Sequence, residues 1–522
     1  MEDKKEKSGK KIKILAFRFN APMQIDILRE LRRRGVEIIY WCGLKKDFDA
    51  VARNKEEFPE TIFHSDLDAV RGIPALGVSV DSFVPVGKDL LNQLLKCESQ
   101  VLTMMNTIDT HGTPLIKKKH IYYKYVRYWY GIFQNMKPDA VIFGDVPHMA
   151  FQYVVYCLAK LLGIKVVTYI DIQVEGRLIF LTDTVHYQSL AAEYARIKND
   201  TVQIGNLNED IQNYYKKQID FKQDASPWYM KREYVDPWAD GFYKFPVFRT
   251  VIKNIQQHTL LKTTYGYVGL LFRKRDHTDL EGFSYPGYVA ALKEWRWKKI
   301  KESFKKEHKR FEVIPNFSKK FVYVPLHFQP ERSTSALGDV FVDQILMIEI
   351  LSAALPKGWV IYVKENPLQW KAPRAQAGRF KGYYEELARI PHTHLVPVGT
   401  STFDLIKKSC AVATVTSTAG WEAILRGKPA LVFGSVFYMY CEGVFKVSDM
   451  DSCVNAFSKI ENGFVLDRQK VINFLAAVDA VSVRGYINDR YRRGQELAIT
   501  DTENAKNIAG EIYKKLLMDS KP

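Results

Sequence analysis

The sequence lacks the hallmarks of secreted, membrane-spanning and zinc-binding proteins. Six cysteines are scattered through 522 residues, with no CxxC pair and no histidine cluster at zinc spacing. Most of them lie in apolar runs, so we expect reduced core thiols and no disulfide framework. The first eleven residues, MEDKKEKSGKK, contain no apolar core of a secretory signal. No apolar run reaches the roughly 18 residues of a membrane span, and we expect a cytoplasmic protein.

The composition is that of a globular protein with a strong basic excess. A chain of 522 residues is too long for one ordinary domain, so two or three are expected. Lys and Arg number 76 against 59 Asp and Glu, a net charge of +17. This excess indicates an acidic partner, such as anionic lipid or a nucleotide-bearing substrate. Nucleic acid is the least favoured partner, because the usual nucleic-acid motifs are absent.

Short buried-strand patterns alternate with helical patterns in both halves of the chain. This alternation predicts an α/β fold with two doubly wound lobes. The predicted strands span residues 11–17, 36–41, 140–143, 165–170, 321–324, 360–363, 394–396, 411–415 and 430–433, and helices are expected at 24–34, 150–162 and 505–517.

The predicted organisation has four parts. They are an N-terminal lobe (1–223), a basic helical connector (224–320), a C-terminal lobe (321–485) and a C-terminal helical segment (486–522). Within the connector, residues 292–310 (LKEWRWKKIKESFKKEHKR) form a basic helix with an aromatic face. This helix is either a solvated connector or a surface that docks on an anionic membrane.

Three hydroxyl residues, Thr416, Ser417 and Thr418, separate an apolar run from a helical pattern. Ser and Thr are common helix N-caps, because they satisfy the free N–H groups of the first turn. The same N–H groups and the helix dipole also attract phosphate. Both interpretations fit this corner when it is considered alone.

Three further predicted strands of the C-terminal half end in polar clusters: HFQPERST after the strand at 321–324, KENP after 360–363 and GTST after 394–396. Parallel sheets bind ligands at the carboxyl ends of their strands, so four clusters on one rim favour the anion site. Ser417 and Thr418 would then bind a phosphate. Glu422 would accept hydrogen bonds from ribose, or else would only complement the helix dipole.

The motifs QPERST (329–334), KENP (364–367), STAGWE (417–422) and GKP (427–429) resemble bacterial capsule polysaccharide biosynthesis proteins. In the N-terminal half, VIFGDVPH (141–148) and the following YVVY (153–156) resemble a segment of the same family. That family consists of two-lobed GT-B glycosyltransferases whose lobes face a cleft, and some use CMP-activated acidic sugars such as Kdo. The resemblance implies transfer from a nucleotide-sugar donor to a lipid-linked or polymeric surface glycan, at the inner face of the membrane.

The chain departs from the family pattern at one position. Asn366–Pro367 stands where the family usually has His-Pro, and related sialyl- and Kdo-transferases use that histidine on the donor. Asn can donate a hydrogen bond but cannot carry a proton or a charge. The resemblance therefore carries over nucleotide-sugar binding, and not a CMP donor or a histidine-assisted leaving group.

Stabilising the leaving phosphate requires basic or N–H donors, and such groups work without a metal. We expect no metal and no cofactor, although Asp66-Leu-Asp68 and Asp449-Met-Asp451 match the Asp-x-Asp pattern of metal-dependent transferases. The expected donor-binding residues are Gln329, Glu331, Arg332, Ser333, Thr334, Lys364, Glu365, Asn366, Pro367, Ser417, Thr418 and Glu422.

An inverting transfer also needs a base on the acceptor side. Asp145 and His148 follow a predicted strand of the N-terminal lobe, and Glu175 is the reserve candidate. Asp145 has a structural alternative, which is to cap the following helix. Two functional alternatives also stay open: a GT-B relative with other chemistry, such as a polyol-phosphate transferase or nucleotide-sugar epimerase, and a decayed glycan-binding protein.

Overall fold

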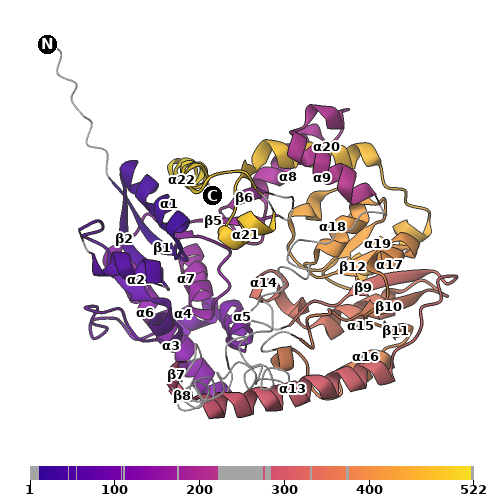
Figure 1. Ribbon diagram of the computed structural model, residues 1–522, viewed down its shortest axis with the longest axis horizontal. Coiled ribbons are helices and arrows are strands. Elements are labelled where there is room, and N and C mark those ends of the chain that lie inside the picture. Colours follow the sequence, from indigo (N-terminus) through magenta and orange to yellow (C-terminus); the bar gives the residue numbers. More distant parts are fainter. Residues whose placement is uncertain are drawn as a thin grey trace, which may run out of the picture. The chain divides into compact units, whose positions relative to one another are not determined.

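The computed structural model describes residues 11–44, 46–54, 56–106, 109, 112–172, 174, 176–220, 274–276, 284–329, 332–371, 375–495 and 497–518. The chain forms two compact units (Figure 1). The first comprises Met1–Met105, Thr113–Glu193 and Ala477–Pro522, and the second comprises Asn106–Gly112 and Tyr194–Ala476.

The first unit is built on a seven-stranded sheet in the order β15-β6-β5-β4-β1-β2-β3. The strands from β3 to β5 are parallel, and β6 and β15 join antiparallel. The strands are β1 (Ile12–Phe17), β2 (Val36–Gly43), β3 (Ile62–Ser65), β4 (Ala140–Phe143), β5 (Lys165–Asp171), β6 (Arg177–Leu181) and β15 (Val483–Arg484). The helices are α1 (Pro22–Arg33), α2 (Lys46–Arg53), α3 (Asp66–Arg71), α4 (Lys88–Gln93), α5 (Leu95–Met105), α6 (Leu115–Met136), α7 (Ala150–Leu161), α8 (Gln188–Ile197), α21 (Asp489–Gly494) and α22 (Asp501–Leu517).

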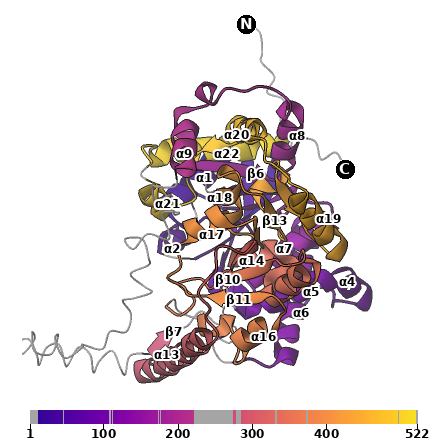
Figure 2. The same ribbon diagram turned by 90° about the vertical axis from the view of Figure 1, so that its right-hand side faces the viewer.

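The C-terminal segment returns to complete this first unit. Ile508 and Ile512 of α22 are buried in one cluster with Ile27 and Leu28 of α1. The yellow α22 lies beside the indigo α1 in both views (Figures 1 and 2). The predicted C-terminal helix is therefore confirmed, and its apolar face is part of the core of the first sheet.

The second unit is built on a six-stranded parallel sheet in the order β11-β10-β9-β12-β13-β14, and β7 (Lys274–Asp276) pairs with β8 (Ser284–Pro286) in a small separate sheet. The six strands are β9 (Phe321–Pro325), β10 (Val360–Lys364), β11 (Thr393–Val396), β12 (Ala411–Thr414), β13 (Ala430–Val432) and β14 (Val444–Lys446). The helices are α9 (Glu209–Ile219), α13 (Gly287–Arg310), α14 (Arg332–Leu337), α15 (Gln344–Ala354), α16 (Tyr383–Arg389), α17 (Thr402–Lys408), α18 (Thr418–Leu425), α19 (Met450–Glu461) and α20 (Arg468–Val481).

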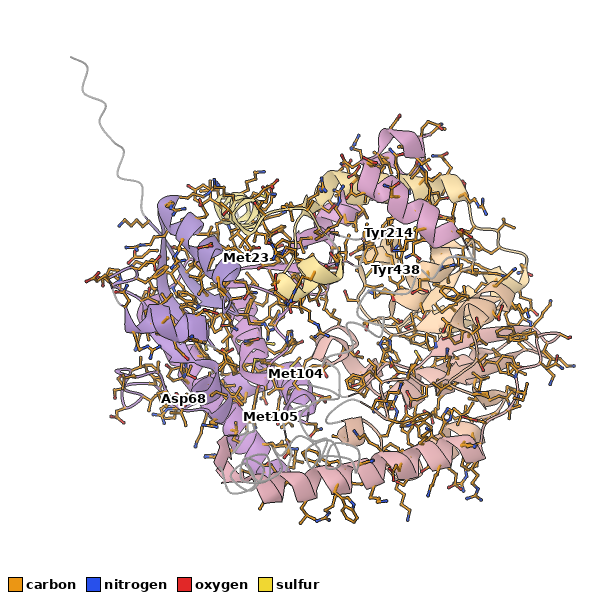
Figure 3. The ribbon with its side chains drawn as sticks, in the orientation of Figure 1. Met23, Asp68, Met104, Met105, Tyr214 and Tyr438 are labelled. Atoms are coloured by element: carbon orange, nitrogen blue, oxygen red, sulfur yellow. The ribbon has the colours of Figure 1, made fainter. Side chains whose placement is uncertain are left out.

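Helix α18 is held firmly inside this second unit. Its Trp421 is nearly fully buried, and its indole N–H donates to the Tyr214 hydroxyl of α9 at 3.0 Å. The ring of Tyr438 stacks on Trp421 at a centroid distance of 5.9 Å, and both tyrosines lie near α18 in Figure 3. The position of the Thr416–Thr418 corner is therefore fixed by packing on the far side of the helix.

The predicted α/β class with two doubly wound sheets is confirmed, as are the nine predicted strands and the helix near residues 292–310. The cysteines are free thiols, as expected. Strands β3, β6, β7, β8, β14 and β15 were not predicted. The predicted four-part division and the cleft between the lobes stay predictions, and much of the connector lies outside the described residues.

Candidate functional site

In both sheets the chain first adds strands on one side of the first strand, β1 or β9, and then crosses to its other side. In the second unit the chain runs from β9 outward to β10 and β11, and then crosses to β12 on the other side of β9. Ligands of open α/β sheets bind at such a switch point, outside the carboxyl ends of the strands. The loops after β9 and β12 are therefore the candidate ligand loops of the second unit.

His327 joins these two loops. It follows the end of β9, is 7% exposed, and its Nε2 accepts a hydrogen bond from the Thr416 N–H at 3.1 Å. Nε2 also lies 3.2 Å from the Thr414 Oγ1 at the end of β12. Because Nε2 accepts, the neutral ring carries its proton on Nδ1. Sequence reasoning missed His327, although its place after a central strand could have revealed it.

The Thr416–Thr418 corner forms the N-terminus of α18, and the capping interpretation is confirmed for Ser417. Its Oγ accepts from the Ala419 N–H at 3.1 Å, and its own N–H donates to Thr414 Oγ1 at 3.1 Å. Several N–H groups of the corner thus have partners within the protein. An anion would be bound mainly by the hydroxyl protons of Ser417 and Thr418, together with the helix dipole.

Glu422 lies in the second turn of α18, so the alternative of first-turn dipole complementation is wrong. Its Oε1 accepts from Thr418 Oγ1 at 3.4 Å, and its Oε2 lies 3.8 Å from Arg426 Nη1. The carboxylate is thus adjacent to the hydroxyl corner, where a ligand at that corner could reach it.

Lys364 brings a buried cation to the same rim. The Nζ at the end of β10 donates to Thr400 O at 2.6 Å, in the loop after β11, and to Thr402 Oγ1 at 2.8 Å, at the start of α17. Burial lowers the pKa of Lys364 to about 8. The ammonium group is therefore mostly charged at neutral pH, and both of these hydrogen-bond partners are neutral.

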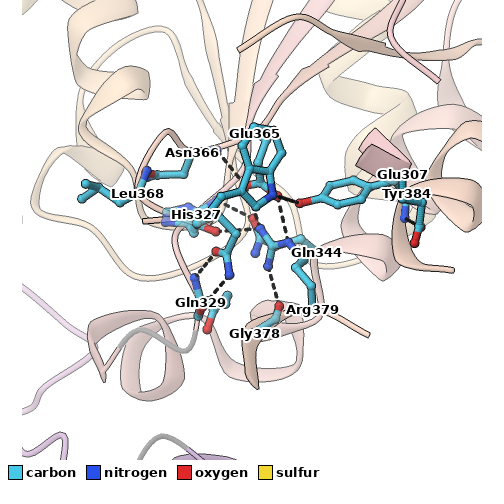
Figure 4. Close-up of polar contacts among 12 residues, drawn as sticks. Glu307, His327, Gln329, Gln344, Glu365, Asn366, Leu368, Gly378, Arg379 and Tyr384 are labelled. Atoms are coloured by element: carbon cyan, nitrogen blue, oxygen red, sulfur yellow. Dashed lines mark hydrogen bonds and ion pairs between the residues drawn. The ribbon is translucent and has the colours of Figure 1, made fainter. Parts of the chain in front are cut away.

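A buried ion pair supports the loop after β10 (Figure 4). Glu365 accepts two hydrogen bonds from Arg379, each of 2.9 Å, and one from the Tyr384 hydroxyl at 2.6 Å. Arg379 Nη2 also donates to His327 O at 3.0 Å. The carboxylate of Glu365 is thus occupied by protein donors, and its visible role is to tie together the loops after β9 and β10.

Two amides complete this network. The side-chain amide of Gln369 accepts from the backbone N–H of Gln329 and donates to the Gln329 carbonyl oxygen, both at 2.8 Å. Gly378 lies so close to Gln329 that a Cβ at position 378 would be 1.9 Å from this carbonyl oxygen. Asn366 Oδ1 accepts from the Leu368 N–H at 3.0 Å, which fixes the turn that contains Pro367. These hydrogen bonds hold the loops after β9 and β10 in a fixed conformation.

Four predicted donor-binding residues have side chains that are either buried or outside the described part of the structure: Glu331, Arg332, Ser333 and Thr334. Thr334 is fully buried on α14. Arg332 and Ser333 begin α14, but their side chains lie outside the described part of the structure. Glu331 lies outside the described residues, as does Glu175, the reserve base.

The first unit has its own switch point between β1 and β4, where two predicted catalytic residues lie together. His148 Nδ1 donates to Val146 O at 2.7 Å and lies 3.8 Å from Asp145 Oδ2. A proton on Nδ1 leaves Nε2 as the basic nitrogen. Helix α7 begins at Ala150 with Met149 as its cap, so the capping alternative for Asp145 is wrong.

The two Asp-x-Asp pairs have structural contacts. Asp66 is buried and accepts from the Cys42 thiol at 3.2 Å, and Asp449 caps α19 by accepting from the Ser452 N–H at 2.8 Å. Among the residues that the structure describes, no three His, Cys, Asp or Glu side chains are grouped to hold a metal ion. Metal-independent transfer stays a prediction.

The C-terminal half of helix α13 packs on the second unit. Phe304 and His308 are buried, and Glu307 accepts hydrogen bonds from the Tyr384 and Gly382 N–H groups at the start of α16. In the N-terminal half, Leu292 and Trp295 are each 58% exposed. Within the described part of the chain, no helix is long and apolar enough to cross a membrane.

Solved structures with some similarity to the chain include three enzymes. The beta Kdo 2,4 transferase KpsC of Thermosulfurimonas dismutans has 15% identity and a TM-score of 0.28, over 65% of this chain and 87% of that one. Its beta Kdo 2,7 transferase has 15% identity and a TM-score of 0.23, over 41% and 62%, so the chain spans less than two thirds of it. The UDP-GlcNAc 2-epimerase of Neisseria meningitidis has 11% identity and a TM-score of 0.21, over 97% and 100%. Similarities of this size carry no argument about function.

No curated protein matches the chain. The sequence pattern of the capsule polysaccharide biosynthesis protein family matches residues 282–455, a segment that contains the whole six-stranded sheet and both loops joined by His327. Residues 282–455 are therefore the part of the chain that is similar to the capsule polysaccharide biosynthesis protein family.

Proposed function

We propose that the protein is a glycosyltransferase that uses a nucleotide-sugar donor and a lipid-linked or polymeric surface glycan as acceptor. The observation that carries the proposal is that Lys364 ends β10 and that Ser417 and Thr418 follow β12, on the two sides of the switch-point strand β9 and at the same carboxyl edge of the family-matched sheet. A cation, two hydroxyls and a helix N-terminus suit the diphosphate of a nucleotide sugar. The same donors stabilise the leaving phosphate without a metal.

In this proposal the second unit binds the donor and the first unit supplies the acceptor-side base. Glu422 accepts hydrogen bonds from the ribose hydroxyls. Glu365 and Asn366 hold the loops in place through side-chain hydrogen bonds to the protein itself, and Gln329 does so through its backbone N–H.

Replacing Ser417 and Thr418 by alanine together tests the donor site. We expect nucleotide-sugar binding to weaken by about 1–3 kcal/mol, the usual loss for hydrogen bonds to a charged group. Isothermal titration with UDP-, CMP-, GDP- and CDP-sugars measures the change and identifies the nucleotide. The double variant Ser65→Ala/Thr500→Ala, which removes two helix caps away from this site, is the matched control. An unchanged affinity in the folded Ser417/Thr418 variant would remove the donor site from this corner.

The depressed pKa of Lys364, about 8, predicts a pH dependence of donor binding. The protonated ammonium attracts phosphate, so affinity should be flat below about pH 7 and fall above pH 8, by up to about tenfold per unit. Titrations from pH 6.5 to 9.5 measure this profile. Lys364→Met should bind more weakly and lose the decline above pH 8. A wild-type affinity that is constant through this range contradicts a role for the Lys364 charge.

Helix α13 is proposed to dock on anionic membrane, where a lipid-linked acceptor would be found. Its solvent side carries Trp295 between basic residues, and each Lys or Arg near such a surface contributes roughly 1 kcal/mol. We expect flotation with anionic vesicles and not with neutral ones. Lys299→Glu/Lys306→Glu should abolish flotation, while Lys446→Glu/Lys459→Glu, an equal change of charge on exposed residues elsewhere, should retain it. Equal losses in both variants would show that only net charge matters.

A further inference from the structure

Three neighbouring strands of the first unit bring different side chains to one level of its switch point. Phe17 of β1 pairs with Phe143 of β4, and Phe143 pairs with Thr168 of β5. The next residues along these strands, Arg18, Gly144 and Tyr169, therefore share a level. The backbones of residues 18 and 144 can lie this close together because residue 144 is glycine. A Cβ at position 144 would lie 2.8 Å from the Arg18 carbonyl oxygen.

Arg18 has a strained backbone at this place. Its φ is +68°, in the left-handed region that costs a non-glycine residue of order 1 kcal/mol or more. Among the described residues its Nε is buried with no hydrogen-bond partner, and its guanidinium forms no ion pair. Glycine or asparagine would fit the backbone better, so the arginine side chain is retained at a cost. Such strain concentrates at ligand-binding positions.

Tyr169 adds a second donor that the fold leaves unused. Its side chain is fully buried, and its hydroxyl has no partner in the described part of the chain. An unpartnered buried hydroxyl is itself unfavourable. Burial raises the pKa of Tyr169, the Asp145 carboxylate raises it further, and the Arg18 guanidinium opposes both. Both charged groups therefore act electrostatically on the phenol.

We propose that Arg18 and Tyr169 bind an anionic group of the acceptor, either a carboxylate or a phosphate, next to Asp145 and His148. Guanidinium forms two parallel hydrogen bonds with either anion, and a phenol O–H donates a third. A neutral sugar would leave these donors without an acceptor, so the acceptor is an acidic glycan. This inference rests on the proposed function and specifies its acceptor.

The test uses three small probes with the full-length protein: glucuronate, glucose 1-phosphate and glucose. We expect at least one acid to bind tenfold or more tightly than glucose in isothermal titrations at low ionic strength. The acid that binds identifies carboxylate or phosphate as the group. Arg18→Asn and Tyr169→Phe should each lose this preference. Equal binding of all three probes by the wild type, or a preference retained in both variants, overturns the proposal.

Stability separates binding from structure in these variants. Asparagine tolerates the left-handed region, and phenylalanine removes a buried hydroxyl without a partner, so both variants should keep or raise the midpoint of thermal unfolding. A lowered midpoint in both would indicate structural roles. Lys137→Asn is the matched control, because Lys137 is another basic residue with a left-handed φ (+45°), at the end of α6. It should leave the acid preference unchanged.

The donor site is tested in the same samples. If Arg18→Asn binds nucleotide sugar normally and the wild type shows no acid preference, only the acceptor inference fails. If the acid preference is present and no nucleotide sugar binds, the donor site fails and the anion site of the first unit stands.

Discussion

His148→Ala is expected to transfer sugar about 10²–10⁴-fold more slowly than the wild type while binding nucleotide sugar normally. The physical reason is that Nδ1 is committed to the Val146 carbonyl, so that Nε2 is the nitrogen able to take the acceptor proton. Asp145 lies 3.8 Å from the ring and would orient it or accept the proton directly. Steady-state rates with saturating donor measure the loss.

Asp145→Asn separates these two roles, since the amide keeps the shape and loses the charge. At least one of the two variants should be nearly inactive. His186→Ala is the matched control, because His186 is an exposed histidine beside Asp183, after β6. If both Asp145→Asn and His148→Ala keep wild-type turnover, the base lies elsewhere, with Glu175 next in line.

Arg379→Met is expected to destabilise the second unit by about 3–5 kcal/mol. The variant leaves the fully buried Glu365 carboxylate without its charged partner, which is the costly way to break a buried ion pair. Urea titration followed by tryptophan fluorescence measures the loss. Arg379→Met/Glu365→Gln should recover part of it, because glutamine is neutral, its one oxygen can accept from the Asn366 N–H, and its NH2 can donate to the Tyr384 hydroxyl oxygen.

Equal stability of the wild type and the single variant would mean that the pair contributes nothing. Arg389→Met is the control, since Arg389 pairs with Glu385 on the exposed side of α16. Exposed pairs typically contribute under about 1 kcal/mol. A comparable loss at Arg389 would contradict the argument from burial.

The strands of both sheets could be predicted because a buried parallel strand is a continuous apolar run. Phe321, Val322 and Val324 of β9 are examples, each essentially without exposure. Strand β15 is only two residues long and pairs with β6 across some 300 residues of sequence. No local pattern encodes that pairing, so neither β15 nor the antiparallel end of the sheet was predicted.

The site could be predicted only where residues follow strands directly. This rule selected Lys364, Ser417 and Asp145, and the structure has each of them at or just after the end of a strand, while their roles stay predictions. Arg379 lies in an irregular segment whose sequence has no periodicity, so it was not predicted. Its partner Glu365 was predicted to bind the donor, whereas the structure has it in a buried ion pair with Arg379. His327 was overlooked although it also follows a strand, because its hydrogen-bonding role becomes visible only when Thr414 and Thr416 are brought beside it.

The return of α22 to α1 has a consequence for synthesis on the ribosome. The residues of the second sheet, up to the end of β14, are all translated before α22 emerges. Until then, Ile27 and Leu28 of α1 lack the apolar partners that α22 supplies. The half of the molecule that begins the chain is thus the last to be finished, and a nascent chain stalled before residue 501 would expose this surface to chaperones and proteases.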